Sequence, residues 1–106
     1  MSVSTAQCQQ LAATPGRFQI SGILDFDSVP VLLAGLSTTD NPMLGKGDIY
    51  IDLADVERAN SAGLGLLIEW LVQARQQQRN IFFCNLPTSL QQIARISDLD
   101  LPLEKV

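Results

Sequence analysis

The chain contains no histidine and only two cysteines among its 106 residues. Without histidine, the commonest general base of enzymes is missing, which excludes a Ser-His-Asp arrangement and leaves no imidazole to activate a serine. Cys8 and Cys84 lack the paired spacing of a zinc site, and no imidazole is present to complete a Cys/His metal site. We therefore predict a protein that is not an enzyme, with no catalytic residue, no metal and no cofactor.

Long apolar runs and concentrated positive charge are also missing. No apolar stretch reaches the ~18 residues that cross a bilayer, and the first residues have neither the charged nor the apolar region of a signal peptide. The net charge is −4 and the seven Lys and Arg residues are spread along the chain. Nucleic acid and anionic lipid would therefore meet no basic patch. We expect a cytoplasmic protein without nucleic-acid binding, direct membrane insertion or a small-molecule substrate, whose partner is another protein.

The residues that are present predict one packed domain over 1–106. Hydrophobic residues make up 46% of the chain and charged residues 17%, which is typical of a globular protein of one-domain size. The acids at Asp52, Asp55 and Glu57 match no metal-binding spacing and are interpreted as solvated loop acids. Cys84 lies in an apolar run and is interpreted as a small buried hydrophobic residue.

The first half of the chain predicts strands followed by a short helix. Residues 17–24 alternate apolar and polar side chains around Gly22, which indicates either the two strands of a hairpin or a strand with a bulge. Asp25 and Asp27 offer caps for a helix, which the apolar residues of 28–36 continue.

The second half alternates strands and helices after a loop at residues 37–47. Residues 48–53 and 81–84 have the composition of strands, and the continuous apolar run of 81–84 favours a strand covered on both faces. A helix follows Ser61, with an apolar stripe formed by Leu64, Leu67, Ile68 and Leu71 and joined at its margins by Leu66, Trp70 and Ala74. Another helix follows Pro87, and residues 99–103 form either a last short strand or coil.

The resulting order is β-β-α-β-α-β-α. Strands that alternate with helices require a sheet whose later strands are parallel, joined by right-handed crossovers. We therefore predict an α/β sandwich, with a mixed β-sheet and helices packed on it.

The pair Asn60-Ser61 stands directly before the helix that follows it. Either residue would cap that helix by accepting a hydrogen bond from a free backbone N–H group. The same position suits a regulatory site, because a helix N-terminus stabilises the negative charge of a phosphate. Gly63 and Gly65 match neither the phosphate-loop nor the dinucleotide-binding spacing of glycines.

Three segments together resemble the STAS domain, the domain of anti-sigma factor antagonists and of sulfate-transporter tails. They are Gly22-Ile23-Leu24-Asp25, Ile51-Asp52-Leu53, and the stretch from Asn60 to Leu67, Asn-Ser-Ala-Gly-Leu-Gly-Leu-Leu. The similarity runs over nearly the whole chain in the expected order of elements, and the resemblance implies a STAS-like sandwich.

Two branches of the family differ at the residues after Asn60. In the antagonists the motif reads Asp-Ser-Ser/Thr-Gly and a kinase phosphorylates the second hydroxyl residue, where this chain has Ala62. Ser61 aligns with the first hydroxyl and is the candidate phosphorylation or switch residue. In the stand-alone, MlaB-type STAS subunit of Mla phospholipid ABC transporters, a Thr or Ser stands at the place of Ser61, followed by a small residue and Gly.

The resemblance to the MlaB-type branch implies a subunit that binds and stabilises the cytoplasmic ATPase of a transporter that maintains outer-membrane lipid asymmetry. Such a subunit would be peripheral to the inner membrane through the transporter complex. The implied partner-binding residues open the helix that begins near Ser61, with the helix after Pro87 as a second contact; they are Asn60, Ser61, Ala62, Gly63 and Gly65. The alternative is an anti-sigma factor antagonist in a kinase-controlled partner-switching pathway.

Overall fold

The computed structural model describes residues 5–11 and 15–103. Its elements follow the predicted order β-β-α-β-α-β-α, with these bounds: β1 (Ala6–Gln10), β2 (Arg17–Leu24), α1 (Ser28–Ala34), β3 (Ile49–Ala59), α2 (Ser61–Gln76), β4 (Ile81–Cys84) and α3 (Thr88–Ile96). No helix in these residues is long and apolar enough to span a bilayer.

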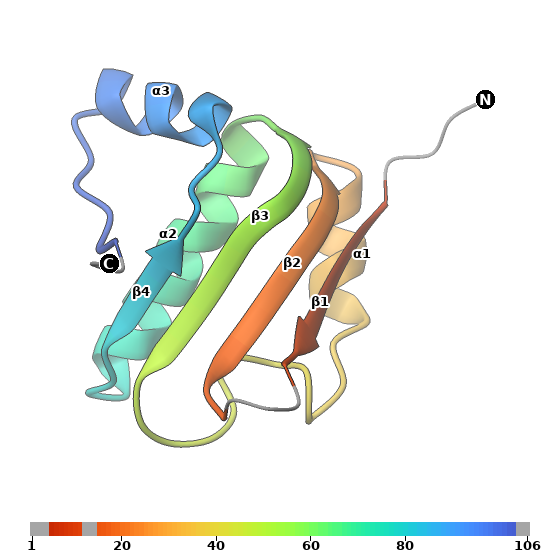
Figure 1. Ribbon diagram of the computed structural model, residues 1–106, viewed down its shortest axis with the longest axis vertical. Helices are drawn as coiled ribbons and strands as arrows, with labels where there is room; N and C mark the ends of the chain where they lie inside the picture. The colour runs from red at the N-terminus through yellow and green to blue at the C-terminus, as the bar shows by residue number, and fades with distance from the viewer. Residues whose placement is uncertain (1–4, 12–14, 104–106) are drawn as a thin grey trace.

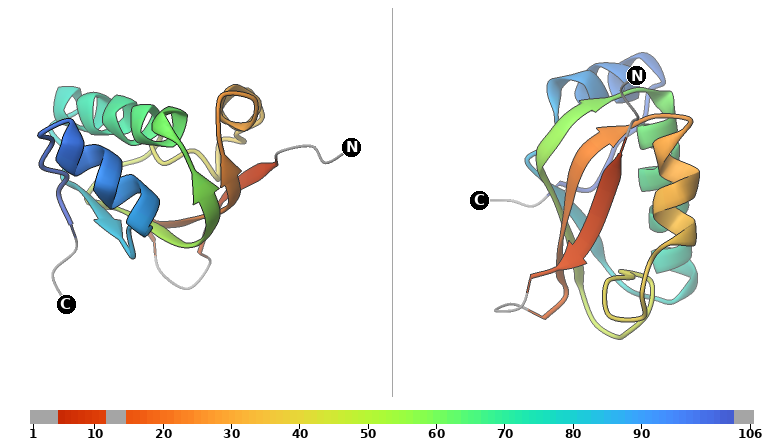
Figure 2. Two further views of the ribbon diagram at one scale, coloured as in Figure 1. Left: turned by 90° about the horizontal axis from the view of Figure 1, so that it is seen from above. Right: turned by 90° about the vertical axis from the view of Figure 1, so that its right-hand side faces the viewer.

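The sheet is mixed, and its strands lie in the order β1-β2-β3-β4. β1 is antiparallel to β2, whereas β2, β3 and β4 are parallel to one another. Helices α1 and α2 cover one face of the sheet, the opposite face carries no helix, and α3 lies beside α2 at the end of β4 (Figures 1 and 2). The predicted α/β sandwich with helices packed on a mixed sheet is confirmed.

The first strand pair differs from the predicted hairpin around Gly22. Residues 17–24 form one strand, β2, and its antiparallel partner is the unpredicted β1. Gly22 has φ +94°, and a Cβ there would collide with the backbone oxygen of Thr5 beside β1. The glycine therefore permits a close approach between strands rather than a turn. Pairing with β3 shifts register beside Gly22, so the bulge is the correct alternative.

The central strand continues six residues beyond the predicted end at residue 53. Asp55 pairs with Ser21 and Ala59 with Leu24, so β3 follows β2 to its end. Two register shifts accommodate extra residues on β3, which breaks the simple alternation that predicts strands. As a result, β2 and β3 end side by side. The helices that follow them, α1 and α2, therefore begin at the same edge of the sheet.

The core lies between the sheet and the helices, and α2 supplies a large part of it. The buried face of α2 is centred on one margin of the predicted stripe, because Trp70 and Ala74 are almost completely buried while Ile68 and Leu71 are only half-buried. Leu64 and Leu67 belong to both sets. The helix is thus rotated toward the side that carries Trp70, which seats the largest side chain of the chain in the core.

Helix α1 ends at Ala34, two residues before the predicted boundary. The Asp25 carboxylate accepts hydrogen bonds from the backbone nitrogens of Asp27 and Ser28, at 2.9 and 2.8 Å, and so satisfies donors at the helix start. Asp27 makes no such side-chain bond. Of the two predicted caps, only Asp25 performs this role.

β4 forms at the predicted residues, and Cys84 is buried as expected. The predicted covering of both faces is wrong at Phe82, which is half-buried on the face without helices and stacks on Tyr50 with ring centroids 5.3 Å apart. The tail supplies a single bridge between Phe83 and Leu103, supported by a 2.8 Å bond from Phe83 N to the Pro102 oxygen.

Candidate functional site

Asn60 joins the end of β3 to the start of α2. Its backbone nitrogen donates to the oxygen of Leu24 at 3.0 Å, and its side-chain oxygen accepts from the Ala62 nitrogen at 2.8 Å. Its backbone is extended, as a cap residue requires, and its own carbonyl accepts the first helical bond, from Gly63. Of the two possible caps, Asn60 is the one that the structure uses.

Ser61 is therefore free of the capping task. It is the first residue of α2, and its side chain is exposed. No acidic residue stands in the first turn of the helix, so an added negative charge at Ser61 would meet the positive end of the helix dipole. Ser61 is placed where either a partner or a modifying enzyme can reach it.

The three small residues after Ser61 divide between the interior and the surface. Gly63 is buried, and a Cβ there would lie 3.1 Å from the Cβ of Leu24 and 3.2 Å from that of Ala59. Gly65 is exposed, with open space where a Cβ would lie, and Ala62 is half-buried. Gly63 thus allows α2 to approach the sheet closely. Gly65 leaves the backbone on the outer side of the helix without a covering side chain.

Helix α1 begins at the same edge of the sheet as α2, because each follows one of two parallel strands that end together. Phe26, in the turn before α1, is 69% exposed, and Leu33 within α1 is 40% exposed. Val31 lines a hollow beside β1. Leu33 lies two residues further, roughly 200° around the helix, and so faces the side of α2.

An apolar surface therefore accompanies the start of α2. We call it the α1–α2 surface and define it by Phe26, Leu33, Ser61, Gly65 and Val72, all of which are exposed. Sequence reasoning missed the contribution of α1, whose predicted apolar face was assigned to the core. The available signal was that apolar residues surround this short helix on every side, with no charged residue between Ser28 and Thr39.

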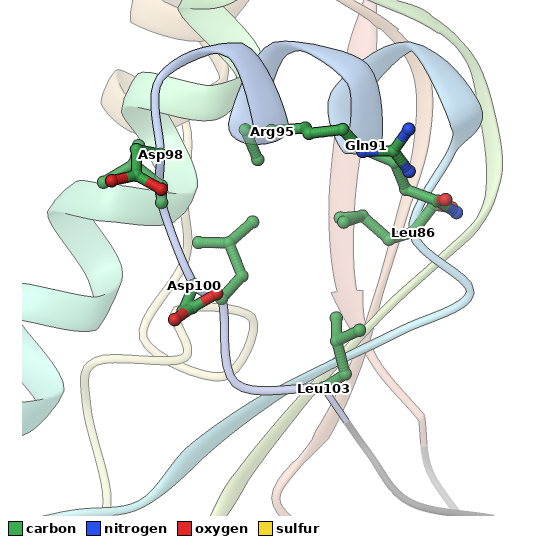
Figure 3. Close-up of a pocket in the computed structure, with 9 residues that line it drawn as sticks. Leu86, Gln91, Arg95, Asp98, Asp100 and Leu103 are labelled. Atoms are coloured by element: carbon green, nitrogen blue, oxygen red, sulfur yellow. The ribbon is translucent and has the colours of Figure 1, made fainter.

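Two hollows lie near the ends of the helices. One, of about 290 Å³, borders the Asn60 cap and is lined in part by Asp25 and Arg58. The other, of about 310 Å³, lies between α3 and the chain that follows it (Figure 3). There Arg95 comes from the helix and Asp98 and Asp100 from the following segment, over a floor that includes leucines.

The predicted loop position of Asp52, Asp55 and Glu57 is wrong, because all three acids lie in β3. Two of them act as hydrogen-bond acceptors. Asp55 accepts from the side-chain amide of Gln19 at 2.6 Å, and Asp52 accepts from the side-chain amide of Asn85 at 3.0 Å and the nitrogen of Ala54 at 2.9 Å. In residues 5–11 and 15–103, no cluster of three or more His, Cys, Asp or Glu side chains is arranged to hold a metal ion. These acids therefore have a local structural role.

Comparison with known proteins agrees with the fold. A family model described as "Mlab, STAS domain" matches residues 9–104, which is nearly the whole chain. No curated protein matches the sequence. The chain therefore belongs to the STAS domain family and is MlaB-like.

Proposed function

We propose that this STAS domain is a non-catalytic subunit that binds and regulates the cytoplasmic ATPase of a Mla-type phospholipid ABC transporter. STAS domains are in general regulatory and interaction domains, and the MlaB-type family match favours the transporter branch. The subunit would hold a position at the inner membrane through its complex with the ATPase. Lipid selection would belong to other components of the transporter.

The observation that carries this proposal is the set of exposed apolar side chains on the α1–α2 surface. Phe26 before α1, Leu33 in α1 and Val72 in α2 are 69%, 40% and 44% exposed, and they belong to the same helical layer as the exposed Ser61 at the start of α2. Exposed apolar side chains gathered on one layer of a small domain are typical of a protein-binding surface. Gly65 adds a place where a partner helix can approach the backbone of α2.

Such a surface is sufficient for regulation without catalysis. A standard protein interface buries ~800 Å² on each partner. A subunit that binds one conformation of an ATPase more tightly than another shifts the population toward that conformation. The proposed effect of this chain is therefore to stabilise the competent form of the ATPase.

The experiment is affinity purification of the tagged protein from its native cell, followed by identification of stoichiometric partners. We expect an ABC-transporter ATPase together with its membrane subunit. Recovery of a serine kinase without an ATPase would overturn the proposal and favour the anti-sigma factor antagonist. That alternative has less support, because Ala62 has no hydroxyl at the position that antagonists phosphorylate.

A further inference from the structure

β1 is an edge strand whose outer backbone groups face away from the sheet. Thr5 accepts a hydrogen bond from Ile23 in β2, and Leu11 donates one to Arg17, so the odd-numbered residues of this segment face β2. In an antiparallel strand the intervening residues point their N–H and C=O groups to the other side. Gln10 confirms this direction, because its nitrogen donates outward to the Asp40 carboxylate at 2.9 Å.

The outward groups of Ala6 and Cys8 are available for pairing. Within the described part of the chain no backbone hydrogen bond reaches them from the outer side, whereas the opposite edge of the sheet is covered at β4 by the bond from Phe83 to Pro102. β1 reads Ala-Gln-Cys-Gln-Gln and contains no proline or charge, the residues that usually protect an exposed edge. β1 is thus an open edge.

A hollow of about 260 Å³ runs along this edge between β1 and α1. Ala6, Leu36 and Val31 contribute apolar walls, and Val31 is 72% exposed. An extended segment that paired with β1 would therefore also cover an apolar side chain of the neighbouring helix. The hollow lies on the flank of α1 opposite to Leu33, and it is separate from the α1–α2 surface.

We propose that β1 pairs with β1 of a second copy of this chain, antiparallel and centred on Gln7. In this register Ala6 of each copy exchanges backbone hydrogen bonds with Cys8 of the other, and the two Gln7 residues lie directly opposite. A register shifted to pair Ala6 with Gln10 is excluded, because the Gln10 nitrogen already donates to Asp40. The sheets of the two copies become one continuous sheet.

The distribution of charge favours a second copy of this chain as the partner of β1. Each copy carries −4, so two copies approach best through a strand whose own residues bear no charge, as those of β1 do. The Asp40 carboxylate meets this edge at Gln10, beyond the pairs formed by Ala6, Gln7 and Cys8. The strand and Val31 together form a small contact, which belongs to the weak and concentration-dependent class of interfaces.

The first test is oxidative cross-linking of the full-length Gln7→Cys variant. Residues directly opposite in a non-hydrogen-bonded antiparallel pair have Cα atoms about 4.5 Å apart, within reach of a disulfide. Gln9→Cys is the matched control, because it is exposed on the same face of the same strand but would lie opposite Thr5. We expect about tenfold more cross-linked dimer for Gln7→Cys, because pairing raises the local thiol concentration.

The second measurement is sedimentation equilibrium of the wild type and of Val31→Glu. We expect the wild type to dimerise as its concentration rises, and Val31→Glu to stay monomeric with an unchanged circular dichroism spectrum, since Val31 is exposed. Equal cross-linking of the two cysteine variants would overturn the β1 contact even if the wild type dimerises. A wild type that stays monomeric at every concentration would overturn the second copy as the occupant. Neither measurement involves the ATPase.

Discussion

At the scale of single residues, Asn60 and Ser61 have different tasks at the start of α2. Asn60→Ala removes the acceptor for the Ala62 nitrogen, so we predict that the free energy of unfolding falls by about 1 kcal/mol. Ser61→Ala removes an exposed hydroxyl and should leave it nearly unchanged. Urea denaturation of both variants checks this, and an equal loss would show that Ser61 shares the capping role.

Gly63 and Gly65 give a second matched pair in the same helix. The Gly65→Ala methyl enters open space, so the higher helix propensity of alanine should stabilise the protein by up to about 1 kcal/mol. The Gly63→Ala methyl meets the Cβ atoms of Leu24 and Ala59, both fixed on strands, and should cost about 1 kcal/mol through overpacking. Thermal unfolding of the two variants checks the opposite signs, and a stabilised Gly63→Ala variant would contradict the close helix–sheet contact.

The Cys8 thiol predicts a pH dependence. Burial, and then the nearby charge of Asp40, raise its pKa from 9.0 to about 12. Above pH 9 the thiol loses its proton in the unfolded chain but keeps it in the folded protein. The contribution of the Cys8 thiol to the free energy of unfolding is therefore complete below pH 9 and falls as the pH rises toward 12. Between about pH 8 and 10 the wild type should lose about 1 kcal/mol more stability than Cys8→Ala. Urea titrations at the two pH values check this, and parallel losses would contradict it.

At the scale of elements, the sequence predicts those whose side chains follow a simple period. The helix after Ser61 and the strand 81–84 have strong apolar patterns and appear where expected. β1 was missed because Ala6 and Cys8 give only a faint inward pattern between glutamines. β3 was cut short because its extra residues break the period of two. Pairing with β2 stabilises both segments, and pairing partners leave no local signal in either strand.

Arg79 binds the segment between α1 and β3 at two points, and Gln77 adds a 3.0 Å bond to the Met43 oxygen. The Arg79 guanidinium donates to the oxygens of Gly47 and Pro42 at 2.9 and 3.1 Å. Arg79→Ala should lower the free energy of unfolding by about 1 kcal/mol, a value reduced by partial exposure, and should speed amide exchange in residues 42–47. Arg75→Ala is the matched control, because Arg75 is exposed in the last turn of α2. Equal effects of the two variants would contradict this role.

At the scale of the whole molecule, the candidate site combines a predicted part and an unpredicted one. The start of α2 was identified from Asn60 and Ser61, since a polar pair before an apolar helix has a local physical meaning. Phe26 and Leu33 were not, because neighbouring helix starts are brought together only by the parallel pairing of β2 and β3. Exposure of an apolar residue is a property of the assembled layer, and the sequence period alone does not reveal it.

The central claim is that the α1–α2 surface binds the transporter ATPase, and the affinity of the purified chain for that ATPase tests it most directly. Ser61→Asp keeps the fold, since an acid suits a helix start, but places charge in the proposed contact. Gln9→Glu adds the same charge on the face of the sheet without helices. We predict at least about a tenfold rise in Kd for Ser61→Asp, equivalent to ~1.4 kcal/mol, and no change for Gln9→Glu. Equal affinities of wild type and Ser61→Asp would contradict the claim.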